Sequence, residues 1–270
     1  MVPITVSGSE QGLSPRNSEV ARLRALSRDR RARREAGRFV VEGIKLVTEV
    51  LASDLVVFEA YADAEWAPPA DFVRALQSDD VDLTMVSRRG IERIASTNSP
   101  QPVVAEVKLP KYTWEHVASG GSMLVALNVN DPGNVGTLAR CAVAAGFDAV
   151  VCLGDTADAF SPKVIRSSAG ALFRVPVIVE RDVSVGLDKI AALGATRFGT
   201  RMDDAQPCDQ VDLSGSVALV LGSEAHGLGI EHAGQMDAWL SIPMPGETES
   251  LNVAMAGAIL TYEVARQRRP

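Results

Sequence analysis

Three short polar loops stand out in this chain because each follows an apolar segment that has the character of a buried strand. The first loop is Asp131–Asn134, the second is Gly222–Glu224, and the third runs from Pro243 to Asn252. Segments such as AVVCLG and VALVLG are typical of parallel strands that are covered on both faces. Ligands of α/β proteins usually bind at the carboxyl ends of such strands. We therefore expect the three loops to converge on one binding site.

A single arginine, Arg140, interrupts a helix-like segment that otherwise consists of Leu, Ala, Cys and Val. It follows Asn134 by six residues. An isolated arginine in an apolar helix is usually an edge residue whose stem packs while its head reaches water. From the residues alone, the ordinary interpretation of Arg140 is therefore an edge residue.

Two common nucleotide-binding motifs are absent from the sequence. Gly222 and Gly227 have the spacing of a phosphate-binding loop, but Leu228 and Gly229 occupy the positions of its lysine and its serine or threonine. No G-x-G-x-x-G string follows a predicted strand, so the dinucleotide fingerprint is missing too. The three cysteines and three histidines form no cluster, and no metal site is expected. The absence of the two nucleotide-binding motifs argues against a nucleotide-binding enzyme and against an ordinary Rossmann protein.

The composition indicates a protein with a substantial core and one locally basic segment. Hydrophobic residues make up 46% of the 270 residues, but no apolar run reaches the roughly 18 residues of a membrane helix. The first residues lack the pattern of a signal peptide, and the scattered cysteines suit free thiols, so we expect a cytoplasmic protein without a membrane partner. The net charge is −7, yet Arg16–Lys45 holds ten basic and four acidic residues.

The basic segment is densest between Arg28 and Arg38. Such a segment is either a solvated helix face or an arm that contacts phosphates. The crowding of like charges favours an anionic partner. The arginines that we assign to this contact are Arg28, Arg30, Arg31, Arg33, Arg34 and Arg38.

Strand-like and helix-like segments alternate in both halves of the chain, which predicts two α/β domains. We expect a smaller domain at residues 1–110, a linker at 111–122, and a larger domain with a parallel sheet at 123–270. The larger domain is predicted to end in a long helix with Thr248 or Ser250 as its N-cap. The small and apolar residues of that helix, among them Met255, Ile259 and Tyr262, predict that its first turns are buried.

Three segments of the chain resemble the signature motifs of a known family. They are NVNDPGNVGTLARCAVAAGFDAV (Asn128–Val150), ALVLGSEAHGLG (Ala218–Gly229) and SIPMPGETESLNVA (Ser241–Ala254). In order and spacing they are similar to the three motifs of the SpoU class of SPOUT RNA methyltransferases; the one departure is Ala254, where the family often has serine. The segments FVVEGIKLVTEVLAS and NSPQPVVA resemble, more loosely, the L30e-like RNA-binding domain that precedes many of these catalytic domains.

The resemblance implies a trefoil-knotted catalytic domain that binds S-adenosylmethionine in a bent form, largely through backbone groups. The corresponding donor-binding positions are Thr200, Gly222, Ile242 and Leu251. The resemblance also implies methyl transfer to a ribose 2′-hydroxyl, with Arg140 as the catalytic arginine. The residues expected to assist it are Asn134, Glu224, Ser250 and Asn252. Whether Arg140 acts on the hydroxyl or only orients an RNA phosphate stays open.

The implied partner is RNA, and the six arginines above are its expected contacts. Ribosomal RNA is favoured over tRNA because the L30e-like domain is typical of the ribosomal-RNA members of the family. The alternatives are a tRNA methyltransferase, an antibiotic-resistance methyltransferase, and a catalytically silent RNA-binding or ribosome-assembly protein. The resemblance further implies a homodimer formed through the knot domain, which fits a terminal helix that is apolar on more than one face.

Overall fold

The computed structural model describes residues 6–7, 12–223, 227–246 and 250–269. It divides into two compact units, each with its own sheet. The first unit contains Met1–Lys111 together with Phe160–Arg166, and the second contains Tyr112–Ala159 and Ser167–Pro270. The segment Phe160–Arg166 falls within the larger of the two predicted domains, yet it groups with the first unit. There the Phe160 ring packs against Phe39, with 5.2 Å between the ring centroids.

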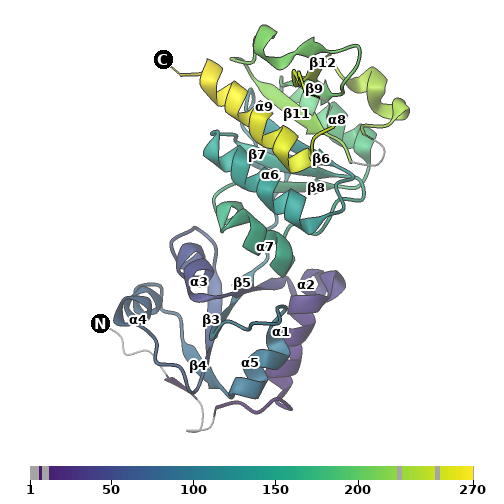
Figure 1. Ribbon diagram of the computed structural model, residues 1–270. Coiled ribbons are helices and arrows are strands. Elements are labelled where there is room, and N and C mark those ends of the chain that lie inside the picture. Colours follow the sequence, from purple (N-terminus) through teal and green to yellow (C-terminus); the bar gives the residue numbers. More distant parts are fainter. Residues whose placement is uncertain (1–5, 8–11, 224–226, 247–249, 270) are drawn as a thin grey trace. The chain divides into compact units, whose positions relative to one another are not determined.

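The first unit is built on a five-stranded mixed sheet in the order β1-β4-β3-β5-β2 (Figure 1). The strands are β1 (Val6–Ser7), β2 (Arg38–Glu42), β3 (Val57–Asp63), β4 (Leu83–Val86) and β5 (Val103–Lys108). The helices are α1 (Ser18–Arg28), α2 (Arg30–Ala36), α3 (Ile44–Leu51), α4 (Ala70–Ser78) and α5 (Arg88–Ile94). Helices α1 and α5 bury their apolar residues against Val40, Tyr61 and Val104 of this sheet.

The arginine-rich segment folds as the two helices α1 and α2, which meet at Asp29. The carboxylate of Asp29 caps α2 by accepting a hydrogen bond of 2.7 Å from the backbone N–H of Arg31. Val20, Leu23 and Leu26 recur every three residues along α1, and all three are buried. The segment is therefore anchored by its apolar stripe while most of its arginines lie on the other sides of the helices.

The second unit is built on a seven-stranded sheet in the order β10-β12-β9-β11-β6-β7-β8, and every pair of neighbouring strands is parallel. The strands are β6 (Met123–Leu127), β7 (Ala149–Leu153), β8 (Val177–Glu180), β9 (Thr196–Thr200), β10 (Gln206–Pro207), β11 (Val217–Leu221) and β12 (Ala238–Ser241). The later helices of the chain are α6 (Pro132–Ala144), α7 (Pro162–Ser168), α8 (Val183–Ala192) and α9 (Val253–Gln267). The predicted α/β class with a parallel sheet is confirmed.

Helices α6 and α9 lie side by side on one face of this sheet (Figure 1), and they meet at Gly257. A Cβ atom on Gly257 would lie 3.1 Å from the Leu221 side chain of β11, and closer still to Leu138 of α6. A glycine therefore permits the close approach of the two helices. Val220, which precedes Leu221 in β11, points to the opposite face of the sheet and packs there with Leu187 of α8.

The start of α9 differs from the prediction. Its N-cap is Asn252, whose Oδ1 accepts a hydrogen bond of 2.8 Å from the backbone N–H of Ala254. Ser250 does not cap the helix, and Thr248 lies outside the described residues. Asparagine and serine cap helices about equally well, so the sequence offered no means of choosing between them.

The apolar residues of α9 are also less buried than predicted. In the single chain the side chains of Met255, Ile259 and Tyr262 are 61%, 40% and 56% exposed. Buried α9 residues such as Val253, Leu260 and Val264 cover the sheet and α6 instead. The helix therefore presents apolar residues to two sides, only one of which is covered within the chain.

Candidate active site

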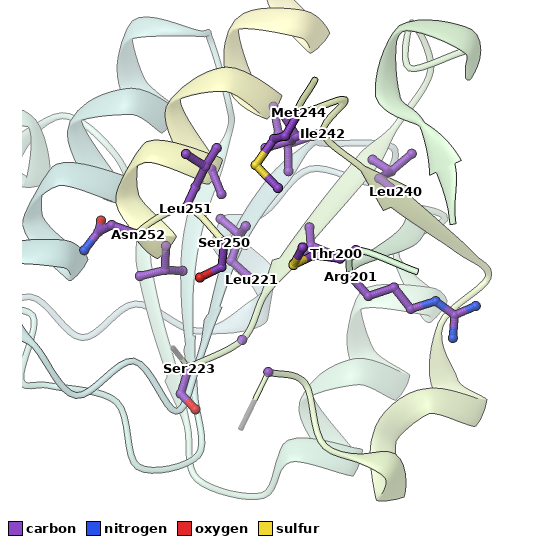
Figure 2. A pocket seen from close by; sticks show the side chains of 16 residues that line it. Thr200, Arg201, Leu221, Ser223, Leu240, Ile242, Met244, Ser250, Leu251 and Asn252 are labelled. Atoms are coloured by element: carbon purple, nitrogen blue, oxygen red, sulfur yellow. The ribbon is translucent and has the colours of Figure 1, made fainter. Parts of the chain in front are cut away.

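A pocket of about 430 Å³ lies at the carboxyl ends of β9, β11 and β12, beside the start of α9 (Figure 2). The four residues predicted to bind a methyl donor, Thr200, Gly222, Ile242 and Leu251, all line it. Two of the residues predicted to assist catalysis also line it, namely Ser250 and Asn252. The structure thus brings the second and third motif loops together at one cavity.

Gly222 is required by the backbone that surrounds it. A Cβ atom at this position would lie 2.6 Å from the backbone nitrogen of Leu228 and closer still to the carbonyl group of Gly227. Backbone atoms cannot rotate away as the end of a long side chain can. Gly227 and Leu228 can therefore lie this close to residue 222 only because it has no side chain.

Asn252 links the third motif to the first. Its Oδ1 caps α9, and its Nδ2 donates a hydrogen bond of 3.2 Å to Oδ1 of Asn134. Asn134 stands in the first turn of α6, where its own backbone N–H is bound by the N-cap carboxylate of Asp131 at 3.1 Å. The two asparagines therefore tie the start of α6 to the start of α9 at the edge of the pocket.

Arg140, the predicted catalytic arginine, does not line the pocket. Arg140 lies exposed on α6, about 9 Å along the helix axis from Asn134 at 1.5 Å per residue. Glu224 lies outside the described residues.

Several pocket residues were missed by the sequence analysis. Met244 and Leu240 flank Ile242 in alternating positions, and Ala256 and Leu260 stand one turn apart on α9. This alternation, which begins in β12 and continues past its end, and the spacing of four on the helix are signals that were available in the sequence. They indicate one apolar wall, but they do not show that the wall faces a cavity and not the core.

The predicted RNA-binding arginines fall into two groups. Arg33 is only 4% exposed, and its Nη1 donates a hydrogen bond of 2.6 Å to the carbonyl oxygen of Leu26. Arg38 is half-buried, and its guanidinium lies 3.2 Å from the buried carboxylate of Glu106. Arg33 thus serves the packing of the first unit, and its burial argues against RNA contact there. Arg30 is half-buried as well, whereas the remaining three arginines are exposed: Arg28, Arg31 and Arg34.

No group of three or more His, Cys, Asp or Glu residues that could hold an ion occurs in the part of the chain that the structure describes. Within that same part, no helix is long and apolar enough to cross a membrane. The pocket offers an apolar cavity, two serines, a threonine, an asparagine, an arginine and the backbone of glycine-containing loops.

Comparison with known proteins gives this arrangement a family. Residues 121–262 match the SpoU rRNA Methylase family, and residues 17–105 match the MRM3-like substrate binding domain. The chain is 35% identical over 235 residues to the 23S rRNA (guanosine(2553)-2'-O)-methyltransferase RlmP of Bacillus subtilis (strain 168). The matched region covers 87% of this chain and 91% of the relative.

Two solved structures are similar over nearly the whole chain. The SpoU methyltransferase AviRb from Streptomyces viridochromogenes in complex with the cofactor AdoMet has a TM-score of 0.84 and 27% identity, and the match covers 94% of this chain and 98% of that chain. An AdoMet-bound rRNA methyltransferase from Sinorhizobium meliloti has a TM-score of 0.83 and 27% identity, with 99% of both chains covered. The fold and the motif loops define a SpoU-type α/β methyltransferase. This chain belongs to the SpoU rRNA methylase family, as its three motifs predicted.

Proposed function

We propose that this protein transfers a methyl group from S-adenosylmethionine to a ribose 2′-hydroxyl of ribosomal RNA. The observation that carries the proposal is the pocket at the ends of β9, β11 and β12, which gathers ten residues of the second and third motifs. Family membership supports it. So do the relatives, since RlmP is named as a 23S rRNA 2′-O-methyltransferase and AviRb was solved with AdoMet.

The pocket suits S-adenosylmethionine in size and in lining. A volume of about 430 Å³ lies within the range of roughly 300–1,000 Å³ that is usual for small-molecule sites. Leu240, Met244 and Leu260 give it apolar walls, which suit the adenine ring and the methylene groups of the donor. Thr200, Gly222, Ile242 and Leu251 would hold the donor, which supplies an activated methyl group when bound.

The protein's own contribution is to hold the two reacting groups in line. Because the donor's methyl is already activated, alignment with the acceptor oxygen dominates the rate. The Asn252–Asn134 hydrogen bond fixes the starts of α6 and α9 relative to each other, so we assign these two residues to that alignment. The Ser250 side chain, which is exposed at the pocket, is assigned to the ribose. Glu224 is assigned the role that the family resemblance implies, which is to assist catalysis by holding the motif loops in place.

Arg140 is assigned to the RNA side of the reaction. Its guanidinium is exposed on α6, in the same helix whose first turn carries Asn134. A planar, permanently charged fork binds a phosphate well and is a poor base. We therefore propose that Arg140 orients the ribose and phosphate of the target nucleotide.

The first unit is proposed to capture RNA through the exposed arginines of α1 and α2. Arg28, Arg31 and Arg34 keep their side chains at the surface, whereas Arg33 is withdrawn into the unit. Contacts of this kind bind phosphates without reading sequence, and they weaken as salt rises. We further propose that the chain is threaded as a trefoil knot and acts in the cytoplasm, where its RNA substrate is found.

A homodimer formed through the second unit completes the proposal. The exposed Met255, Ile259 and Tyr262 form an apolar strip along one side of α9. A helix with apolar residues on two sides needs cover on both, and the chain covers only one. A second copy of the same helix is the simplest cover, since most oligomers are symmetric.

The proposal is tested by incubating the purified chain with tritium-labelled S-adenosylmethionine and either deproteinised ribosomal RNA or tRNA. We expect label in 2′-O-methylnucleosides of the ribosomal RNA. Arg140→Ala should transfer no label and still bind the donor in calorimetry, whereas Arg181→Ala, an exposed arginine of the same unit, should behave as wild type. Label only in tRNA would favour the tRNA enzyme. A chain that binds RNA but no donor would be the silent RNA-binding protein.

A further inference from the structure

Phe58 is the one phenylalanine of this chain that lies at the surface. The chain has seven phenylalanines, and the other six are at most 6% exposed. Phe58, at the start of β3, is 40% exposed. An exposed aromatic ring costs hydrophobic free energy, and in a folded protein it often marks a contact surface.

A β-bulge sets the direction of this side chain. β3 and β5 pair in register from Glu59 onward, but the register shifts between Val57 and Glu59, where Val57 faces Val107 and Glu59 faces Glu106. Phe58 is thus the extra residue of β3 and has no partner position on β5. Bulges of this kind bend a strand and re-aim a side chain, and they recur beside functional sites.

Arg38 covers this ring and is itself held in place. Its guanidinium carbon lies 4.0 Å from the centroid of the Phe58 ring, which is the geometry of a cation–π contact. Its Nη1 lies 3.2 Å from Glu106, a carboxylate that is 1% exposed and that also pairs with Arg22. The buried carboxylate therefore fixes the guanidinium plane against the ring.

A fixed arginine stacked on an exposed aromatic ring matches what unpaired bases bind. Proteins recognise single-stranded RNA by stacking splayed bases on aromatic side chains or on guanidinium planes. Arg34 is exposed in the preceding helix, four residues before Arg38, and suits the phosphate of such a nucleotide. We propose that Arg38 and Phe58 form a stacking platform for an unpaired nucleobase of the RNA substrate. This inference rests on the proposed function and adds a base-contacting site to it.

The test is the affinity of the full-length chain for a short fluorescein-labelled oligoadenylate, compared with a duplex of the same length. Alanine substitution of a stacking aromatic costs about 1–3 kcal/mol per base, so Phe58→Ala should bind the single strand between about 5-fold and 150-fold more weakly. Duplex binding should change by less than about twofold, because paired bases cannot stack on a side chain. Phe58→Trp should restore the single-strand affinity.

Val56→Ala is the matched control, since Val56 is 51% exposed two residues away and offers apolar area without a ring. It should bind both RNAs as wild type does. Phe58→Leu keeps the apolar area and should behave like Phe58→Ala. If Phe58→Leu keeps wild-type affinity for the single strand, the aromatic ring makes no stacking contact with a base, and the platform is wrong. Unchanged single-strand binding by Phe58→Ala, with an unchanged melting temperature, overturns it as well.

Failure of the platform and failure of the proposed function are separable. If the wild-type chain methylates ribosomal RNA and Phe58→Ala binds oligoadenylate normally, only the platform proposal is refuted. In the methylation assay, Phe58→Ala is expected to raise KM for RNA about as much as it weakens binding. Its kcat should stay within about twofold of wild type, because a lost ground-state contact affects binding and not the chemical step.

Discussion

Replacing Gly222 by alanine should weaken donor binding because the new side chain displaces the facing backbone, not because it fills the pocket. The new Cβ would stand 2.6 Å from the Leu228 nitrogen, so the facing backbone must withdraw by roughly 1 Å to reach ordinary contact. Such overpacking costs about 1–3 kcal/mol of stability and lowers the melting temperature by about 2–12 °C. Loss of two backbone hydrogen bonds to the donor, at about 1 kcal/mol each, would weaken binding roughly 30-fold.

The assay is isothermal titration calorimetry with S-adenosylmethionine, alongside thermal melts of the same samples. Gly234→Ala is the matched control, because a Cβ atom there meets nothing within 4 Å and its backbone is not left-handed. It should bind the donor as wild type does. If alanine at 222 binds within twofold of wild type and only valine fails, then the side chain acts by occupying the cavity, and the backbone argument is refuted.

Three further predictions concern Arg140, the exposed surface of α9 and the ion pair between Arg197 and Asp237. Arg140→Lys keeps the charge but loses the planar fork, so single-turnover methylation should fall at least about 10-fold while donor affinity holds; a near-normal rate would make Arg140 a mere edge residue. Ile259→Lys should give a monomer in light scattering, while Val185→Lys, another exposed apolar residue, should stay dimeric; a dimer in both variants would move the interface elsewhere. The hydrogen bond from Arg197 lowers the pKa of Asp237, so this pair stabilises the fold above the carboxyl's ordinary pKa and the contribution disappears as pH falls through the folded-state value. In Asp237→Asn the loss of stability on acidification should shrink, by less than about 1 kcal/mol because the pair is partly exposed, and an unchanged acid limb in denaturant melts would contradict this.

The parallel sheet was predictable because buried parallel strands are apolar throughout. The segments AVVCLG and VALVLG were expected to be buried parallel strands, and they contain β7 and β11. The two-residue strand β10 was not predicted, since Gln206–Pro207 has no pattern of its own and is a strand only because it pairs with β12. A segment of that length owes its structure to its neighbour.

The residues predicted to bind the donor line one pocket, but the contacts around them depend on packing. Asn252 was expected to assist catalysis, and only the structure shows that one side chain both caps α9 and binds Asn134. Arg33 looked like its neighbours in a run of arginines. Its burial depends on how α1 and α2 meet at Asp29, which no count of charges reveals. The bulge at Phe58 depends likewise on its partner strand.

The most direct test of the central claim is a map of ribose methylation across total RNA from cells with and without this chain. We predict that one 2′-O-methylated nucleotide of the large-subunit ribosomal RNA disappears when the chain is absent. It should return with the wild-type chain and not with Arg140→Ala. An identical map in both cells, or a lost methyl group on a base and not on a ribose, would contradict the account.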